Sequence, residues 1–275
     1  MFYSKTSNLL KLTLGLGLIF SLSACSDEDD TMDQMPEPKL ASLEVESQVI
    51  SQNMIEVSLA DVPADGWIVI HADNGNNGPV VPDIISEPAF IEAGSNQSVM
   101  VQIDGDAQIE DGDQVWVMLH EDTGTEMVYE FDGNTDLDPP FLVNESPVMA
   151  PININSASID VSNASVANGV VTIGEVVAAA DGWLVIHNDN GMGGIVLPGI
   201  IGKTMVSKGV NTNVTVQLDA GVNINSGQML FPMLHLDTGI IGQYEFDGNS
   251  SVDGPEIFGN DPFPGNVIFT SFMVQ

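Results

Sequence analysis

Residues 181–191 read Asp-Gly-Trp-Leu-Val-Ile-His-Asn-Asp-Asn-Gly, and residues 65–75 read Asp-Gly-Trp-Ile-Val-Ile-His-Ala-Asp-Asn-Gly. The two stretches agree at nine of eleven positions and lie 116 residues apart. Two further landmarks recur in the same order: Val-x-Val-Gln-[Ile/Leu]-Asp at 99–104 and 214–219, and Tyr-Glu-Phe-Asp-Gly at 129–133 and 244–248. Self-similarity at a fixed long period is the sequence signature of a duplicated structural unit. The chain is therefore expected to contain two copies of one domain.

The four histidines of the chain share one local pattern, His-x-Asp-[Asn/Thr]-Gly, at the end of an apolar run. They are His71, His120, His187 and His235. Each copy of the repeat contributes two of them. This regularity describes architecture and does not by itself name a chemistry.

The apolar segments within each copy are short, rich in β-branched residues and separated by Gly, Asn, Asp and Pro. Several of them alternate apolar with polar side chains, as half-buried strands do: 42–49, 55–59, 99–103 and 127–131. The spacing of strands and turns predicts an all-β chain of two tandem immunoglobulin-like antiparallel β-sandwich repeats. We place the first sandwich at residues 41–150 and the second at 151–275.

The first 24 residues have the composition of a secretory signal peptide. Lys5 and Lys11 precede a short apolar run, which is below the roughly 20 residues that a membrane-spanning helix needs. The following Leu-Ser-Ala-Cys, ending at Cys25, resembles the lipobox of bacterial lipoproteins, in which the cysteine is lipidated and becomes the first mature residue. An ordinary cleaved signal and a transmembrane anchor are the alternatives.

The lipoprotein resemblance carries an expectation about location. Ser26 follows Cys25 where an inner-membrane lipoprotein of a Gram-negative bacterium would have Asp, so the resemblance favours the outer membrane. Covalent lipid chains hold a protein to a membrane by burying their methylene groups. Residues 25–40 are acidic, contain proline and have few large apolar side chains, which predicts a disordered tether between lipid and fold.

The chain is a strong polyanion, with 39 acidic against 5 basic residues and a formal net charge of −34. Such a charge repels phosphate backbones, so nucleic-acid binding is not expected. Salt or divalent cations would screen the self-repulsion, which suits a saline environment.

Strand alternation gives the histidines a possible role in binding metal. Trp67, Val69 and His71 would share one strand face, and Met118 and His120 another. If the two strands are neighbours, two imidazoles and a thioether gather in an apolar setting, a soft ligand set that suits copper. The candidate copper ligands are His71, Met118 and His120 in the first copy and His187, Met233 and His235 in the second.

The alternative is that the histidines are structural. An imidazole at a strand end can bond the backbone of a turn, while Asp and Asn cap the bend and Gly supplies a positive φ. The sequence has no nucleophile elbow, zinc-protease helix motif or phosphate-binding glycine loop, so we expect no enzymatic activity.

Acidic turns of the first copy provide a second candidate site. Carboxylate oxygens are the hard ligands that calcium prefers. The candidate ligands are Asp104, Asp106, Asp111, Asp113, Asp132 and Asp136. The second copy keeps few of these acids, and no stretch matches a complete EF-hand loop. Solvated turns are the alternative.

The repeated pattern as a whole, from Asp-Gly-Trp-[Ile/Leu]-Val-Ile-His to Tyr-Glu-Phe-Asp-Gly, resembles an uncharacterised secreted domain of haloarchaeal surface proteins and exported bacterial proteins, often found in tandem. The resemblance covers nearly the whole mature chain and implies no activity. One departure between the copies is Pro232, where the first copy has Val117; without a backbone donor it predicts a sheet edge or bulge.

The sequence is thus interpreted as a non-enzymatic, lipid-anchored surface or periplasmic protein that binds a partner or has a structural role. Its expected attachment is to the membrane through the lipidated N-terminus, and a protein or glycan partner stays unidentified. A copper-binding protein and a calcium-dependent adhesion or glycan-binding module are the alternatives.

Overall fold

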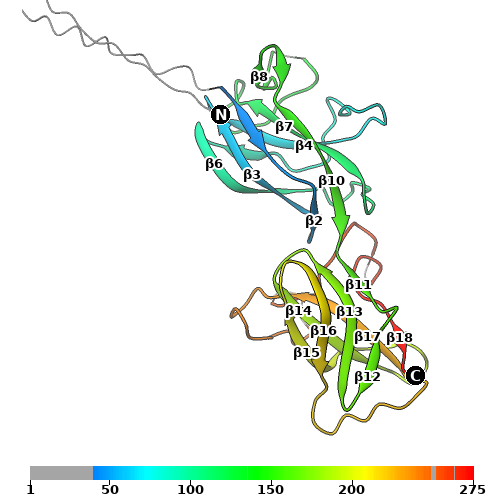
Figure 1. Cartoon of the computed structure of the whole chain (residues 1–275). Helices are drawn as coiled ribbons and strands as arrows, with labels where there is room; N and C mark the ends of the chain where they lie inside the picture. The colour runs from blue at the N-terminus through cyan, green and yellow to red at the C-terminus, as the bar shows by residue number, and fades with distance from the viewer. Residues whose placement is uncertain (1–39, 135, 249–251, 263) are drawn as a thin grey trace, which may run out of the picture. The chain divides into compact units, whose positions relative to one another are not determined.

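The computed structural model of the chain describes residues 40–134, 136–248, 252–262 and 264–275 (Figure 1). All regular elements in these ranges are β-strands. The predicted signal peptide, Cys25 and the predicted tether up to residue 39 lie outside them. Among the described residues, no helix has the length and apolar character to cross a membrane.

The first repeat consists of two main sheets. One has the order β1-β3-β6 and the other β2-β10-β7-β4-β5, with a separate two-stranded hairpin β8-β9. The strands are β1 (Ser42–Glu44), β2 (Gln48–Ile50), β3 (Met54–Val62), β4 (Gly66–Ala72), β5 (Ala89–Ile91), β6 (Gly94–Gln102), β7 (Gln114–Glu121), β8 (Leu142–Val143), β9 (Ser146–Pro147) and β10 (Met149–Ser156).

The second repeat copies this plan. One sheet has β13 at its centre, paired with β11, β12 and β16, and the other has the order β15-β14-β17-β18. The strands are β11 (Ser158–Asp160), β12 (Ser165–Ala167), β13 (Val170–Ala178), β14 (Gly182–Asp189), β15 (Ile195–Val206), β16 (Gly209–Gln217), β17 (Met229–Leu236) and β18 (Phe272–Met273). All-β architecture with two tandem sandwiches is therefore confirmed.

A separate hydrophobic core lies inside each sandwich. In the first repeat, Ile55 and Val57 of β3 meet Ile68 and Ile70 of β4 in one buried cluster. The second core has the equivalent residues of β13 and β14. Burial of apolar area on this scale is the main term that stabilises such a fold.

The strands β4 and β7 are buried on both faces, unlike β3. Burial alternates along β3, whereas six consecutive residues of β4, Gly66–His71, are all buried. The reason is that loops cover the face of β4 and β7 that points away from the core. That covered face carries a second, smaller cluster built around Trp67, Val69 and Met118.

The strand β10 closes the second sheet of the first repeat. Its residues Met149 to Asn153 pair antiparallel with β7, and Ile154 to Ser156 pair parallel with β2. The parallel pair is the exception in an otherwise antiparallel set. β10 also spans the position between residues 150 and 151, where we placed the boundary from sequence.

The two repeats are in contact through a turn of the first. Asn53 is 6% exposed and donates its side-chain amide to the Asn260 side chain at 2.8 Å. Its side-chain oxygen accepts the Gly259 N–H at 2.8 Å, and the Gln52 N–H donates to the Ile257 carbonyl at 3.0 Å. The residues 257–260 belong to a segment of the second repeat that is longer than its counterpart, the β8-β9 hairpin. The described residues from Leu40 to Gln275 belong to a single compact unit.

Candidate functional site

Both histidines of each repeat lie on the covered face of the central strand pair. The register of β4 and β7 sets Trp67 opposite His120, Val69 opposite Met118 and His71 opposite Trp116. We call these six residues the histidine face of the first repeat. In the second repeat the face consists of Trp183, Val185, His187, Phe231, Met233 and His235, in the same register.

The two imidazoles of each face lean toward one another. By register, His71 and His120 are offset by four residue positions, or about 13 Å along the strands at about 3.3 Å per residue. Their ring centroids are nevertheless only 6.1 Å apart, and those of His187 and His235 are 6.3 Å apart. The side chains therefore bend inward over the Val69–Met118 pair or its counterpart.

Each imidazole is fixed by its Nδ1 atom. The Nδ1–H of His71 donates to the carbonyls of Val80 and Asp83 at 2.9 and 2.8 Å, and that of His120 donates to the carbonyl of Asp138 at 2.6 Å. A carbonyl accepts but does not donate, so Nδ1 carries the proton and Nε2 keeps a lone pair. His187 and His235 repeat these bonds with Val196, Gly199 and Asp253.

The four Nε2 atoms are buried, and none has a hydrogen-bond partner among the residues that the structure describes. The histidine residues themselves are 0–1% exposed. Burial lowers the pKa of all four, to about 4 for His120 and His235, where the neighbouring histidine adds repulsion. All four rings are consequently neutral at pH 7, with an unshared electron pair at Nε2.

A buried aspartate in each repeat ties down the loop that covers the histidines. The Asp138 carboxylate accepts the backbone N–H of Thr123 at 3.0 Å and that of Glu130 at 2.6 Å. Asp253 binds Thr238 and Glu245 in the same way. The sequence analysis missed Asp138 and Asp253, although their constant spacing of 18 residues after the second histidine of each repeat was a usable signal.

Aromatic rings close the face from outside. In the first repeat Tyr129 and Phe131 make edge contacts with His120, at centroid distances of 5.5 and 4.7 Å. Tyr244 and Phe246 do the same with His235. The Tyr129 hydroxyl and the Trp67 Nε1 are also buried without a partner, and burial raises the pKa of Tyr129.

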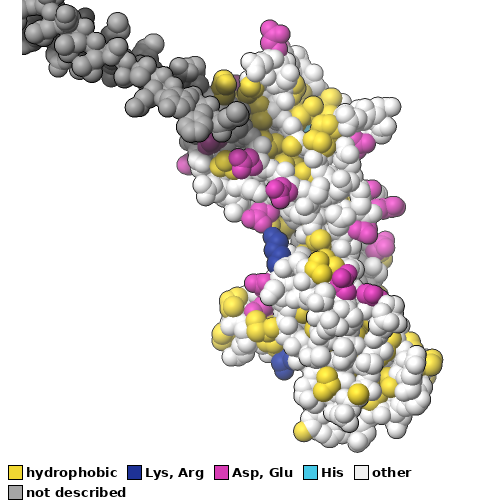
Figure 2. All heavy atoms as spheres, in the orientation of Figure 1, with side chains coloured by type: hydrophobic (Ala, Val, Ile, Leu, Met, Phe, Trp, Pro, Cys, Tyr) yellow, Lys and Arg dark blue, Asp and Glu magenta, His cyan; other side chains and the backbone are white. Residues whose placement is uncertain are grey.

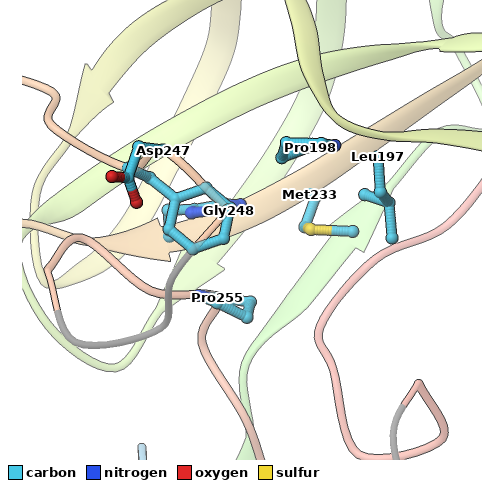
Figure 3. Close-up of a pocket in the computed structure, with 8 residues that line it drawn as sticks. Leu197, Pro198, Met233, Asp247, Gly248 and Pro255 are labelled. Atoms are coloured by element: carbon cyan, nitrogen blue, oxygen red, sulfur yellow. The ribbon is translucent and has the colours of Figure 1, made fainter.

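A pocket opens above the histidine face of the second repeat. It is a cavity of about 730 Å³ whose walls include Met233, His235, Phe246 and Pro255. Figure 3 shows Met233 among the pocket residues Leu197, Pro198 and Pro255. The corresponding hollow of the first repeat, about 590 Å³, is lined by Pro82, Ile84, Tyr129 and Phe131, and neither histidine nor Met118 lines it. The second-repeat pocket thus borders its histidine face directly, although the histidines of both repeats are equally buried.

The Asp-Asn-Gly that follows the first histidine of each repeat forms the turn that we expected from sequence. The Asp73 carboxylate accepts the Gly75 N–H at 2.8 Å and the Trp116 indole N–H at 2.8 Å. Gly75 has a φ of 73°, which glycine adopts without steric cost. Asp73 is therefore a turn cap that also anchors the outer rim of the histidine face.

The six candidate calcium ligands are not assembled into one site. Three of the carboxylates accept backbone N–H groups instead. Asp111 accepts that of Ser156, Asp113 that of Glu110 and Asp132 that of Asn134. Asp136 accepts the Asn134 side-chain amide. Partial burial raises the pKa of Asp104, and repulsion from Asp106 adds to this effect. Within the described ranges, no three His, Cys, Asp or Glu side chains come together as a metal site.

Both repeats match one protein family. Residues 41–155 and 157–266 each fit the model described as "Domain of unknown function (DUF7282)". The chain belongs to the DUF7282 family. The expected resemblance to an uncharacterised tandem domain is thereby confirmed, and the family description assigns no activity.

A curated relative of this DUF7282 chain is Cell surface glycoprotein 1 of Haloarcula hispanica. The two are 29% identical over 129 residues, which is 47% of this chain and 13% of the glycoprotein. This chain thus spans only a small part of that relative's length.

Two solved structures show weak likeness to the DUF7282 chain. One is the chaperone–tip adhesion subunit pre-assembly complex of archaic chaperone-usher Csu pili of Acinetobacter baumannii, with 10% identity, a TM-score of 0.25 and coverage of 71% of this chain and 93% of that one. The other is CBD12 from CALX1.2, with 9% identity, a TM-score of 0.23 and coverage of 77% and 84%. TM-scores this low support no functional statement.

Proposed function

We propose that this protein is an exported, lipid-anchored surface protein whose two DUF7282 sandwiches bind a partner or build surface structure, without enzymatic activity. The observation that carries the proposal is the pair of family matches together with the similarity to a cell surface glycoprotein. The lipobox-like sequence ending at Cys25 and the acidic residues after it support attachment through a lipid and a tether.

The surface composition supports a role outside the cell. Acidic side chains greatly outnumber basic ones, and on the face shown in Figure 2 they lie scattered, with most on the first repeat. A high net charge of one sign keeps a protein soluble and prevents self-association, and it is best tolerated where salt screens it.

The burial of the histidines supports a non-enzymatic role. A general base must come within hydrogen-bond reach of the proton it abstracts. All four imidazoles are 0–1% exposed, and their Nδ1 protons are engaged by backbone carbonyls. Their lowered pKa makes them weak bases, so proton transfer to a substrate in solution is not what this geometry favours.

We propose the loops and the pocket of the second repeat as the surface that contacts a partner. Met192 and Ile241 lie in loops and are 88% and 76% exposed, and Leu197, which is 43% exposed, lines the pocket. Exposed apolar side chains on loops are typical of surfaces that contact a protein or glycan.

Lipid anchoring is tested by expressing the chain in a Gram-negative host with a labelled fatty acid. Wild type is expected to incorporate the label and to fractionate with the outer membrane, whereas Cys25→Ser incorporates none. Ser26→Asp is the matched variant, since it keeps the lipid and is expected to redirect the protein to the inner membrane. An unlabelled wild-type protein released as a soluble product would contradict the proposal.

A further inference from the structure

We propose that each repeat holds one copper(I) ion between the Nε2 atoms of its two buried histidines, with the methionine thioether of the same face as third ligand. The sites are His71, His120 and Met118 in the first repeat and His187, His235 and Met233 in the second. The inference does not depend on where the protein is located.

The first argument is the recurrence of unpaired imidazole nitrogens. A buried acceptor without a partner costs about 1–3 kcal/mol, and native proteins rarely keep such groups. Here four Nε2 atoms are buried and unpartnered, two on each histidine face, while every Nδ1 is well bonded. A histidine that donates Nδ1–H to a backbone carbonyl and presents Nε2 is the usual arrangement of a metal ligand.

The second argument is the distance between the rings. A metal–nitrogen bond of about 2.0 Å places an imidazole centre about 3 Å from the ion, so two rings on one ion have centres about 6 Å apart when the nitrogen–metal–nitrogen angle is wide. The observed centroid distances are 6.1 Å for His71 and His120 and 6.3 Å for His187 and His235. A wide angle with few ligands is a geometry that copper(I) accepts.

The third argument is the chemistry of the ligand set. Met118 is on the same strand face as His120, two residues earlier, and lies diagonally across the strand pair from His71. Thioether and imidazole ligands select copper(I) over hard cations. The three ligands, two imidazoles and a thioether, are neutral. The Asp138 carboxylate, which accepts backbone N–H groups, lies nearby and supplies one negative charge to balance a buried monovalent ion.

The two sites differ in access. The second-repeat pocket reaches Met233 and His235, whereas Tyr129 and Phe131 line the hollow above the first site. Metal is therefore expected to enter and leave the second site faster than the first.

The test uses the purified full-length chain in detergent, stripped of metal. Copper(I) is supplied under reducing conditions with a competing chelator, and silver(I) serves as a probe without redox chemistry. The expected result is two ions per chain, with a shift of all four Nε2 signals in two-bond ¹H–¹⁵N spectra and retention of the Nδ1–H signals. A folded protein that binds no copper(I) or silver(I), with unchanged Nε2 signals, would overturn the proposal.

Variants separate this site from adventitious binding by the acidic surface. Met118→Leu and Met233→Leu nearly conserve volume and should keep the fold, while weakening the affinity of the altered repeat about 10- to 100-fold, as loss of groups that support a metal site does. Met100→Leu, an exposed methionine, is the matched control and should change nothing. His71→Ala should reduce the stoichiometry to one ion. Binding that survives all of these substitutions would be adventitious and would contradict the proposal.

Discussion

The two repeats share their histidine faces but differ in what surrounds them. Phe141 packs into the core of the first repeat, and the structurally equivalent residue of the second is the buried glutamate Glu256. The equivalence follows from their backbone bonds, because Phe141 N–H donates to Leu119 and Glu256 N–H donates to Leu234. The two repeats thus share the candidate site but differ at one core position, which is aromatic in the first and ionisable in the second.

A second difference accompanies the first. The Glu256 carboxylate accepts the Ala179 N–H at 2.9 Å, and the residue equivalent to Ala179 in the first repeat is Pro63, which has no N–H. We therefore expect a glutamate at this position to be tolerated better in the repeat that offers it a hydrogen-bond donor. Burial raises the pKa of Glu256 to about 7 despite this bond.

The largest expected effect comes from copying the glutamate into the first repeat. Phe141→Glu removes a core aromatic ring and buries a carboxyl group beside a proline that cannot donate, so the free energy of unfolding should fall by about 4 kcal/mol. Urea unfolding followed by tryptophan fluorescence measures this loss.

The companion variants test the role of the donor. Adding Pro63→Ala to Phe141→Glu supplies the missing N–H and should recover about 1.5 kcal/mol, the typical net value of a hydrogen bond to a charged group. Pro63→Ala alone is the control. If the double variant is no more stable than Phe141→Glu, the absence of a donor does not explain why the first repeat lacks a glutamate.

The next effect is a pH dependence confined to the second repeat. The pKa of Glu256 is about 7 in the folded state and about 4.5 in the unfolded state. Between these two pH values the unfolded state releases the proton while the folded state keeps it, so the free energy of unfolding falls as pH rises from about 4.5 to 7. The loss amounts to about 3 kcal/mol at about 1.4 kcal/mol per pH unit. Glu256→Gln stays neutral and should gain that much over wild type between pH 4.5 and 8.

Denaturant titrations of both proteins at pH 4.5, 6 and 8 give the comparison. The histidines act in the opposite sense, because their lowered pKa means that stability is lost as pH falls from about 6.5 toward 4. Both proteins share that histidine effect, so it cancels in the difference. Parallel pH profiles for wild type and Glu256→Gln would disprove the assignment to Glu256.

A smaller effect is expected at the contact between repeats. Asn53 has a φ of 56° and binds Gly259 and Asn260, whereas the equivalent position of the second repeat is Gly169. Asn53→Gly keeps the backbone conformation and removes those hydrogen bonds, so it should cost about 2 kcal/mol.

The control is Asn168→Gly, at an exposed position with a φ of 53°. It should change the unfolding free energy by only a few tenths of a kcal/mol. Hydrogen exchange at residues 257–260 should also accelerate in Asn53→Gly and not in the control. If the two variants lose the same free energy of unfolding and exchange equally fast at residues 257–260, Asn53 stabilises only its own turn and not the contact between the repeats.

Local sequence patterns predicted which side chains of the histidine face share a strand face, but not that the two strands are neighbours. Alternation along residues 65–71 and 116–120 placed His71, Met118 and His120 on faces that the strand pairing then brought together. Pro232 lies inside β17, opposite Ile186, and its carbonyl accepts the Thr270 N–H at 3.1 Å. The regular pairing of β18 covers only Met229 and Leu230, and beyond Pro232 the neighbouring segment pairs through the isolated bridge Met233–Phe269.

Long-range partners were beyond sequence reasoning. In sequence, Asp138 cannot be told from an exposed acidic turn residue. Its burial depends on a loop that brings it back to Thr123, 15 residues earlier, and no local pattern shows that contact. Glu256 resembled a surface acid for the same reason, since its donor Ala179 lies 77 residues earlier. The boundary that we placed between residues 150 and 151 also falls inside a strand, because β10 (Met149–Ser156) closes the first sandwich by pairing with β7.

The path of β10 has a mechanical consequence. The chain passes from β10 to β11 through a single residue, Ala157, so there is no slack between the repeats. Tension along the chain would pull β10 lengthwise against β7, and hydrogen bonds perpendicular to the strand would have to break together rather than one after another. The connection between the repeats would thus be pulled parallel to the strands, in shear, which is the direction in which a β-sheet resists force best.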